Sequence, residues 1–386
     1  MSERLEVLLK KSSDYVMSTW EVQDFLNKIS SNYYKLDLLN ELNKVINEGT
    51  SLKQIVIFDK SFDFNQKYEF LKDTSVIYLT SNSGVKNFFH LGLPIGLLPQ
   101  TKLIELRIKY ILFRDINTYL NSIKVDRLDK SQLKEITFTS FEEAISLIRS
   151  NYIQNIELKY EDEEKIFYEK KCEEILSEKL LEYSNYIEKC DGICEFTEQI
   201  VQNEKDVYSK VFNSEYKNFF GLFNDNFARL ERPVIGVFDN ELQQVKILCR
   251  QHIHRSSRGS SFLDLKSFSH NSPTIIQLYS GLVFVLPLLA VGIYGYKNLF
   301  EKIEGDDESV APENMIIRMD QKLKDLGELL EEKKVVGTQP IQNKYAENVI
   351  NFFKDEAINK FNENLNNHEF LNTNIEIIVV KNDNNS

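Results

Sequence analysis

A basic stretch past the middle of the chain carries residue types that bind anions. Two of the five histidines stand one residue apart there, and basic residues outnumber acidic ones from Lys246 to His270. On a strand, alternate side chains share a face, so positions 250, 252 and 254 would point to the same side. Guanidinium, imidazole and ammonium groups bind phosphates and lipid headgroups. The predicted anion or headgroup site consists of Arg250, His252, His254, Arg255, Arg258 and Lys266.

The same stretch allows two other interpretations, a metal site and a plain polar loop. Two imidazoles on one face are suitable ligands, but zinc and iron sites need a third and a fourth ligand, and no His, Cys or carboxylate follows at ligand spacing. The four cysteines match neither a disulfide framework nor a zinc knuckle. We therefore predict no metal, no cofactor and reduced thiols, and we keep the polar loop as the alternative for residues 255–261.

A second group of polar residues follows two short β-branched runs, residues 54–59 and 75–80. Ligands of open α/β sheets gather at the carboxyl ends of strands. The pattern predicts a small-molecule site formed by Asp59, Thr80, Ser81, Ser83 and Gly84. A helix N-cap explains the serine-rich loop equally well, because serine hydroxyls accept from the first free backbone N–H groups of a helix. The chain contains no Gly-x-Ser-x-Gly elbow, no His-Glu-x-x-His and no set of kinase motifs. This favours a non-enzymatic role.

These residues must be positioned by helices and short strands. Ser18 with Glu21, and Ser140 with Glu143, have the spacing of capping boxes. We expect the first fifty residues to be helical with a stop at Gly49 and with an apolar stripe that consists of Phe25, Ile29, Leu36, Leu39, Leu42, Val45 and Ile46. We expect residues 136–138 to form a strand, and residues 104–120 to form a helix or a strand. Residues 162–189 predict a long charged helix that ends near Gly192. Its predicted apolar side consists of Tyr168, Cys172, Ile175, Leu176, Leu180, Tyr183 and Ile187. Residues 232–239 and 244–254 predict a β-hairpin.

The segment from Ser267 to Tyr296 contains no charged residue, and residues 278–296 are nearly all apolar. About 20 apolar residues are enough for a helix to cross the hydrocarbon core of a membrane. Basic residues before the segment outnumber those after it, which predicts that the preceding side faces the cytoplasm. A buried helix of a soluble domain is the alternative, and Pro287 favours it.

The C-terminal region predicts helices followed by a strand at residues 375–380. Apolar residues recur at offsets of three and four, which is the pattern of a helix that packs along another helix. The predicted seam consists of Ile316, Met319, Leu323, Leu326 and Leu330.

The predicted fold is mixed α+β. It contains a small α/β layered domain, extensive helical regions, a β-hairpin, one hydrophobic helix and a helical C-terminal arm. The expected regions are a helical region at 1–50, the α/β domain at 51–160, a charged helical region at 161–230, the hairpin with the basic stretch at 231–266, the hydrophobic segment at 267–299 and the arm at 300–386.

The predicted function is a non-enzymatic scaffold or adaptor on the cytoplasmic side of the inner membrane, which acts through protein partners or self-association. A net charge of −12 argues against a general nucleic-acid binder, because phosphates require a basic excess. Two alternatives stay open. One is a soluble nucleotide- or phosphate-binding enzyme or sensor that uses the loop after the second strand. The other is a structural subunit of a large bacterial secretion or phage-related assembly. If the hydrophobic segment is a buried helix, the expected localisation is cytoplasmic.

Overall fold

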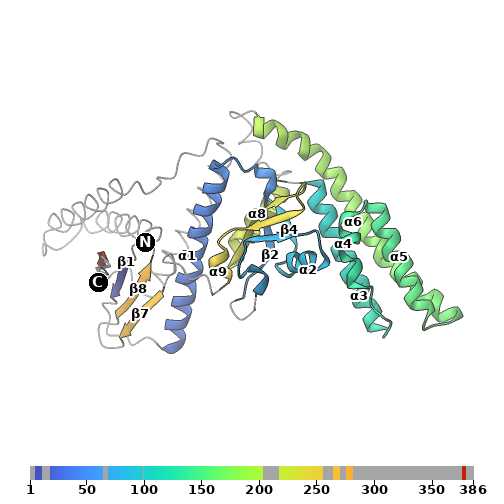
Figure 1. Cartoon of the computed structure of the whole chain (residues 1–386), viewed down its shortest axis with the longest axis horizontal. Helices are drawn as coiled ribbons and strands as arrows, with labels where there is room; N and C mark the ends of the chain where they lie inside the picture. The colour runs from blue at the N-terminus through green and yellow to red at the C-terminus, as the bar shows by residue number, and fades with distance from the viewer. Residues whose placement is uncertain are drawn as a thin grey trace, which may run out of the picture. The chain divides into compact units, whose positions relative to one another are not determined.

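The computed structural model describes residues 5–10, 18–63, 68–98, 100–202, 217–254, 264–269, 275–280 and 376–379. The chain divides into two compact units (Figure 1). The first unit consists of Met1–Asn47, Gly259–Gln342 and Lys354–Ser386, and the second of Glu48–Arg258 and Asn343–Phe353.

The first unit contains a four-stranded antiparallel sheet with the order β7-β8-β1-β9. Its strands are β1 (Leu5–Lys10), β7 (Asp264–Ser269), β8 (Ile275–Ser280) and β9 (Glu376–Val379). The expected C-terminal strand is confirmed and pairs with β1 of the same chain. The helix expected at the very start of the chain is wrong over residues 5–10, because β1 satisfies its backbone groups by pairing with β8 on one side and β9 on the other.

The hydrophobic helix predicted from Leu278 does not begin there. Residues 278–280 belong to β8, where Leu278 pairs with Val7 of β1 and with Leu265 of β7. A short apolar run fits a strand as well as a helix, and pairing partners on both sides decide for the strand. Residues 281–296 lie outside the described residues, as do Arg255, Arg258 and the seam from Ile316 to Leu330. Among the helices that the structure describes, none combines the length and apolarity needed to cross a membrane. Membrane attachment stays a prediction.

Helix α1 (Thr19–Asn47) belongs to the first unit. The predicted capping box is confirmed: the Ser18 N–H donates to a Glu21 carboxylate oxygen at 2.6 Å, and the Glu21 N–H donates to the Ser18 hydroxyl at 3.3 Å. The helix buries the apolar stripe that the sequence predicts, which consists of Phe25, Ile29, Leu36, Leu39, Leu42, Val45 and Ile46. Gly49 follows the helix with a positive φ of 98°, in the left-handed region where glycine commonly stops a helix.

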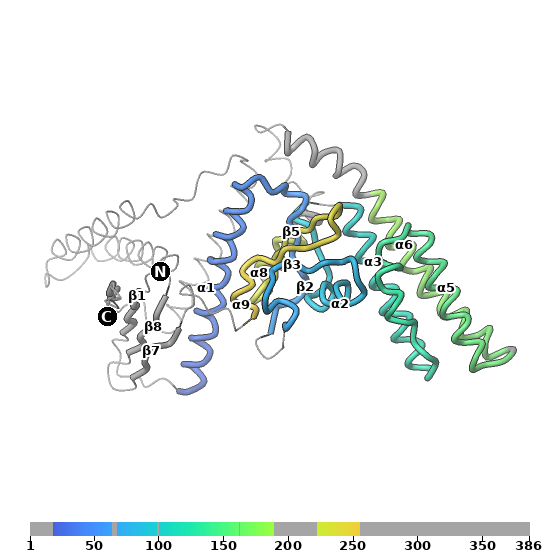
Figure 2. Tube along the Cα trace, in the orientation of Figure 1, coloured from blue at the N-terminus to red at the C-terminus, as the bar shows by residue number. Residues whose placement is uncertain are grey.

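The second unit is built on a five-stranded antiparallel sheet with the order β3-β6-β5-β2-β4. Its strands are β2 (Ile55–Ser61), β3 (Val76–Tyr78), β4 (Pro94–Gly96), β5 (Pro233–Asp239) and β6 (Gln244–Ile247). The hairpin β5–β6 lies between β2 and β3, although it is far from both in the sequence. Figure 2 draws this late part of the described chain in yellow. The regions expected at 51–160 and 231–266 thus share one sheet, and the fold is mixed α+β.

Helices accompany the sheet and extend beyond it. They are α2 (Asn82–His90), α3 (Thr101–Ser122), α4 (Leu133–Phe138), α5 (Phe141–Glu157), α6 (Asp162–Gln202), α8 (Lys217–Arg229) and α9 (Arg250–Ile253), with the short 3₁₀ turns η1 (Leu52–Gln54), η2 (Glu69–Leu71) and η3 (Lys130–Gln132). Helix α8 contacts β2 and β4, α2 contacts β3, and α3 contacts α4, α5 and α6.

Two expectations about these helices need correction, and one alternative that the sequence left open is decided. Residues 136–138 are helical in α4 and not a strand, and the Thr137 hydroxyl donates to the Leu133 carbonyl at 2.6 Å, as threonine does inside helices. The ambiguity at residues 104–120 resolves to the helix α3. Helix α6 passes through Gly192 and ends at Gln202, since a glycine inside a helix costs only about 1 kcal/mol. The apolar side predicted for α6 is confirmed at Cys172 and Leu176, which are buried.

The second strand of the hairpin is shorter than the sequence predicts. It ends at Ile247, Cys249 adopts a left-handed conformation with a φ of 50°, and residues 250–253 form the single turn α9. The alternation expected for positions 250, 252 and 254 is therefore wrong, because a helical turn and not a strand carries them.

Candidate functional site

Asp59 acts as a structural residue between β2 and β4. Its carboxylate accepts a hydrogen bond from the Leu93 N–H at 2.8 Å, and its own N–H donates to the Leu93 carbonyl at 3.1 Å. Gly92 precedes this contact with a φ of 128°, and a Cβ there would lie 2.7 Å from the carboxylate. The side chain that the sequence offers as a ligand thus fixes the turn into β4.

The loop from Thr80 to Gly84 caps a helix. The Ser81 hydroxyl accepts from the Gly84 N–H at 3.1 Å and lies 3.0 Å from the Ser83 hydroxyl. Gly84 is buried, and any side chain there would collide with the Tyr78 carbonyl. The loop lies at the start of α2, whereas Asp59 binds Leu93, which follows the end of α2. Because the nine residues of this helix span about 13 Å, the loop and Asp59 lie at opposite ends of it. These two halves of the predicted small-molecule site do not come together.

The basic stretch is also divided among different roles. Arg250 donates from one guanidinium nitrogen to the carbonyls of Leu71 and Lys72, at 3.1 and 2.7 Å, and so holds the end of η2. His252 is buried in α9, and His254 is half-buried just after it. Lys266 lies on β7, in the other unit. No group of three His, Cys, Asp or Glu side chains suited to a metal ion occurs among the described residues.

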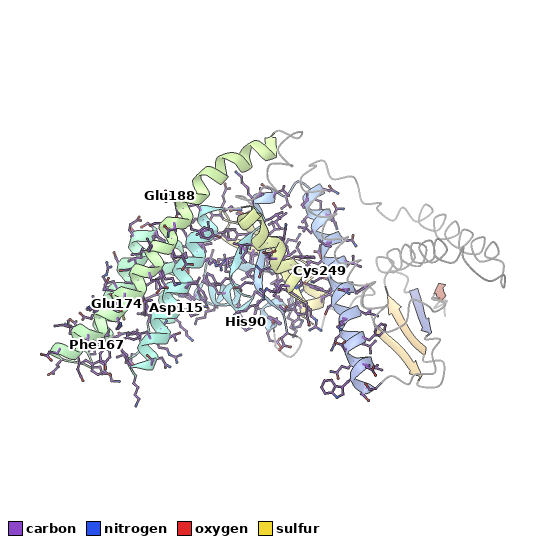
Figure 3. The ribbon with its side chains drawn as sticks, turned by 180° about the vertical axis from the view of Figure 1, so that it is seen from behind. His90, Asp115, Phe167, Glu174, Glu188 and Cys249 are labelled. Atoms are coloured by element: carbon purple, nitrogen blue, oxygen red, sulfur yellow. The ribbon has the colours of Figure 1, made fainter. Side chains whose placement is uncertain are left out.

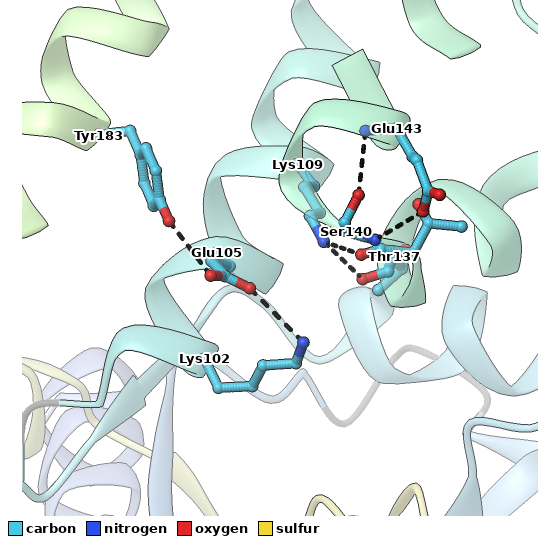
Figure 4. Close-up of polar contacts among 8 residues, drawn as sticks. Lys102, Glu105, Lys109, Thr137, Ser140, Glu143 and Tyr183 are labelled. Carbon is cyan, nitrogen blue, oxygen red and sulfur yellow. Dashed lines mark hydrogen bonds and ion pairs between the residues drawn. The ribbon is translucent and has the colours of Figure 1, made fainter. Parts of the chain in front are cut away.

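A buried lysine that sequence analysis missed lies under α4. Lys109 on α3 is fully buried and donates to the Thr139 carbonyl at 2.5 Å and to the Thr137 carbonyl at 3.5 Å (Figure 4). Burial lowers the pKa of this ammonium group. Because the carbonyls at the end of a helix are otherwise unpaired and carry partial negative charge, the lysine acts as a cap for α4.

Helices α5 and α6 form a hairpin that a polar cluster holds together. Arg149 donates to both carboxylate oxygens of Glu173, at 2.6 and 2.9 Å, and the hydroxyl of the buried Tyr152 donates to the same carboxylate. The hydrogen bonds from Arg149, with that from Tyr152, hold the pKa of Glu173 below its usual value. Burial raises the pKa of the Cys172 thiol to about 12, so this thiol is inert.

The same hairpin is fixed to α3 and to the start of α5. The Tyr183 hydroxyl donates to the Glu105 carboxylate at 3.2 Å, and Lys102 pairs with that carboxylate at 3.5 Å (Figure 4). The ring of Tyr183 stacks on Phe141 with a centroid distance of 3.9 Å. Ser140 and Glu143 form the predicted capping box at the start of α5. These contacts join α3, α5 and α6, which we call the platform.

Apolar and aromatic side chains gather where α5 ends and α6 begins, and we call them the tip cluster. Leu158, Ile166 and Phe167 are 78%, 66% and 56% exposed, well above the exposure of ordinary core residues. Figure 3 places Phe167 near the free end of the hairpin. The tip cluster consists of Leu158, Tyr160, Ile166, Phe167 and Tyr168.

The rings of the tip cluster are held in place. Tyr160 and Tyr168 have centroids 4.6 Å apart, and Tyr168 and Phe167 meet edge to face at 5.5 Å. The Tyr160 hydroxyl donates to the Ile123 carbonyl at 2.8 Å, which ties the cluster to the end of α3. The cluster is thus an exposed apolar surface of fixed shape.

Exposed glutamates alternate with the tip cluster in the sequence, and we call Glu157, Glu161, Glu163 and Glu164 its acidic rim. Glu157 pairs with Lys165, whereas the exposed Glu161, Glu163 and Glu164 take part in none of the ion pairs found among the described residues. Burial, together with Tyr160 and Glu164, raises the pKa of Tyr168. Residues 157–165 contain five acidic residues and two lysines, and one of these, Lys159, lies over the Tyr160 ring at 5.5 Å. The cluster and its rim thus combine apolar contact area with an excess of negative charge.

A small cavity of about 250 Å³ lies at the end of β2. Its floor consists of buried apolar side chains and its rim of exposed polar ones, an arrangement common in ligand sites. The rim carries Lys60, Ser61 and His90, and the His90 ring packs against Tyr68 at a centroid distance of 5.5 Å. Neither Asp59 nor the Thr80–Gly84 loop lines this cavity.

Comparison of the chain with protein-family models, curated proteins and solved structures found no match.

Proposed function

We propose that the protein is a non-enzymatic adaptor that docks a partner protein on the tip of the α5–α6 hairpin. The observation that carries the proposal is the exposure of Leu158, Ile166 and Phe167 on an acid-rimmed helical end. Soluble proteins seldom leave apolar and aromatic side chains grouped in solvent unless another surface covers them.

The chemistry of the tip defines the partner. Aromatic residues supply much of the binding energy of protein interfaces, since each covers a large area and has few rotatable bonds. Polar residues at the rim set orientation and specificity. Because Glu161, Glu163 and Glu164 alternate with the tip cluster in the sequence, the partner surface should be apolar at its centre and basic at its edge.

The proposal is tested by placing a photo-crosslinking amino acid at Phe167 or at Leu181 in cells that make the full chain. Leu181 is the matched control, because it is 64% exposed on the same helix but stands outside the tip cluster. We expect an adduct from position 167 alone, joined to a lysine- or arginine-rich surface of one partner.

The partner identified in this way is then purified, and its affinity is measured by calorimetry. The double variant Ile166→Asp/Phe167→Asp should weaken binding by about tenfold or more, whereas Leu181→Asp should leave the affinity unchanged. Equal adducts from both positions, no adduct, or undiminished binding of the double variant would contradict the proposal. So would an adduct between two copies, because two acidic rims repel.

A further inference from the structure

A groove runs along α3, and none of the side chains of the tip cluster lines it. It encloses about 280 Å³ and is lined by side chains of α3 and of the segment that follows it. Its cations are Arg114, Arg127 and Lys130, and no carboxylate lines it. A basic concave surface is notable on a chain whose net charge is −12.

Hydrogen bonds hold the walls of the groove in place. The Leu128 N–H donates to the Asn117 side-chain carbonyl at 2.7 Å, which attaches the following segment to α3. Arg127 donates to the Asn121 side-chain carbonyl at 2.7 Å, so its guanidinium group is oriented before any ligand arrives. Preorganised donors bind a ligand at a lower entropic cost than mobile ones.

The charge of the groove can be counted. Arg114 pairs with Asp115 at 3.0 Å, and the two charges cancel. Asp129 stands next to Lys130, but its carboxylate accepts from the N–H of Ser131 at 2.7 Å and from the Ser131 hydroxyl, and it does not line the groove. Within the lining, Arg127 and Lys130 therefore remain as cations for a ligand, whereas their chain neighbours Asp126 and Asp129 carry negative charge outside the lining.

An aromatic wall completes the groove. Tyr110 lines it, and the ring of this tyrosine stacks on Phe89 with a centroid distance of 3.8 Å and an interplanar angle of 8°. The ring is therefore fixed in position. Such a wall suits the apolar or planar part of a ligand whose anionic end meets the cations.

We propose that this groove binds a small organic phosphate monoester. A phosphate monoester carries a charge of about −1.5 to −2 at pH 7, which matches the two remaining cations, and its oxygens accept from a guanidinium group in a bidentate manner. The amides of Asn117 and Asn121 add polar groups, and the Tyr110 wall contacts the organic part. The groove is too small for a nucleic acid, which needs an extended basic track to meet successive phosphates.

The test is isothermal calorimetry of the full chain with phenyl phosphate and with inorganic phosphate, at low ionic strength. Phenyl phosphate should bind more tightly than inorganic phosphate, because only the ester reaches the aromatic wall. The double variant Arg127→Ala/Lys130→Ala should weaken phenyl phosphate binding by about tenfold or more, since it removes the charge-assisted hydrogen bonds. Arg127→Lys keeps the positive charge but removes the paired N–H donors of the guanidinium group, so it should give a smaller loss of affinity.

Lys102→Ala is the matched control, because this lysine lies on α3 outside the groove. It should leave the affinity unchanged, and circular dichroism should show that all the variants are folded. Absence of binding, equal affinity for inorganic phosphate and the ester, or equal affinity of the wild type and the double variant would each overturn the proposal.

Discussion

The sheet and the helical platform of the second unit both use polar side chains to bind backbone groups, but the side chains that we propose as sites lie on the platform. Around the sheet, Asp59, Ser81 and Arg250 bind backbone groups of the chain itself. On α3, α5 and α6, the tip cluster and the basic groove face solvent. Short connections between strands leave backbone groups that only side chains can satisfy, whereas a helix satisfies its own backbone and leaves its outer side chains available.

The largest effect should come from Gly84→Ala, which tests whether the loop after β3 is structural. The added Cβ would collide with the backbone carbonyl of Tyr78, which cannot move without disturbing β3. We expect a loss of about 3 kcal/mol or more in the free energy of unfolding, measured by urea denaturation.

Gly49→Ala is the control for this substitution. Gly49 has a positive φ but no atom within 4 Å of an added Cβ, so only backbone strain of about 1 kcal/mol should appear. If the two variants lose equal stability, close packing of Gly84 against the Tyr78 carbonyl does not explain why the loop needs a glycine.

A smaller effect should follow from Asp59→Ala, which leaves the Leu93 N–H without its carboxylate partner. We expect a loss of about 1–2 kcal/mol by the same denaturation measurement. Asp59→Asn keeps an acceptor oxygen and should restore much of this loss. A variant Asp59→Ala as stable as the wild type would leave the carboxylate available for another role and would break the contrast between sheet and platform.

The smallest effect should come from Arg149→Met, which removes the ion pair between α5 and α6. Both side chains are more than one third exposed, so solvent weakens the pair and we expect about 0.5 kcal/mol at pH 7. The pKa of Glu173 lies below its ordinary value of 4.5, so the stabilisation is present above about pH 4.5 and is lost as the pH falls through the folded-state pKa.

Urea denaturation at pH 7 and at pH 3 should therefore show the difference between Arg149→Met and the wild type shrinking at acid pH. Lys171→Met is the matched control, because Lys171 pairs with Glu174 within α6 and does not join two helices. If this control loses as much stability as Arg149→Met, the ion pair between Arg149 and Glu173 stabilises the α5–α6 hairpin no more than a pair within one helix does.

Local signals in the sequence predicted many elements correctly. Both capping boxes, the stripe of α1, the hairpin β5–β6 and the buried side of α6 are confirmed, because each depends on spacing within one element. The strand expected at residues 136–138 is wrong because the structure of this segment depends on contacts with residues distant in the sequence. Its β-branched residues belong to a helix that Lys109, distant in sequence, caps at its end.

The two surfaces proposed as sites could not be predicted from local signals in the sequence either. Arg114, Asn117 and Asn121 share a face only if residues 101–122 are helical, and the sequence left helix and strand open there. The apolar residues of the tip are visible in the sequence, but their pattern does not distinguish exposed from buried positions.

By itself, the sequence determined the long helices α1 and α6, the start of α5 and the strands β2, β5 and β9, since capping, periodicity and turns act over a few residues. The tertiary structure decided which polar side chains are already bound and which are presented to solvent. That distinction depends on backbone groups brought close from distant parts of the chain, such as Leu93 to Asp59 and Leu71 to Arg250. Hydrogen bonds of this kind depend on distance in space and not on spacing in the sequence.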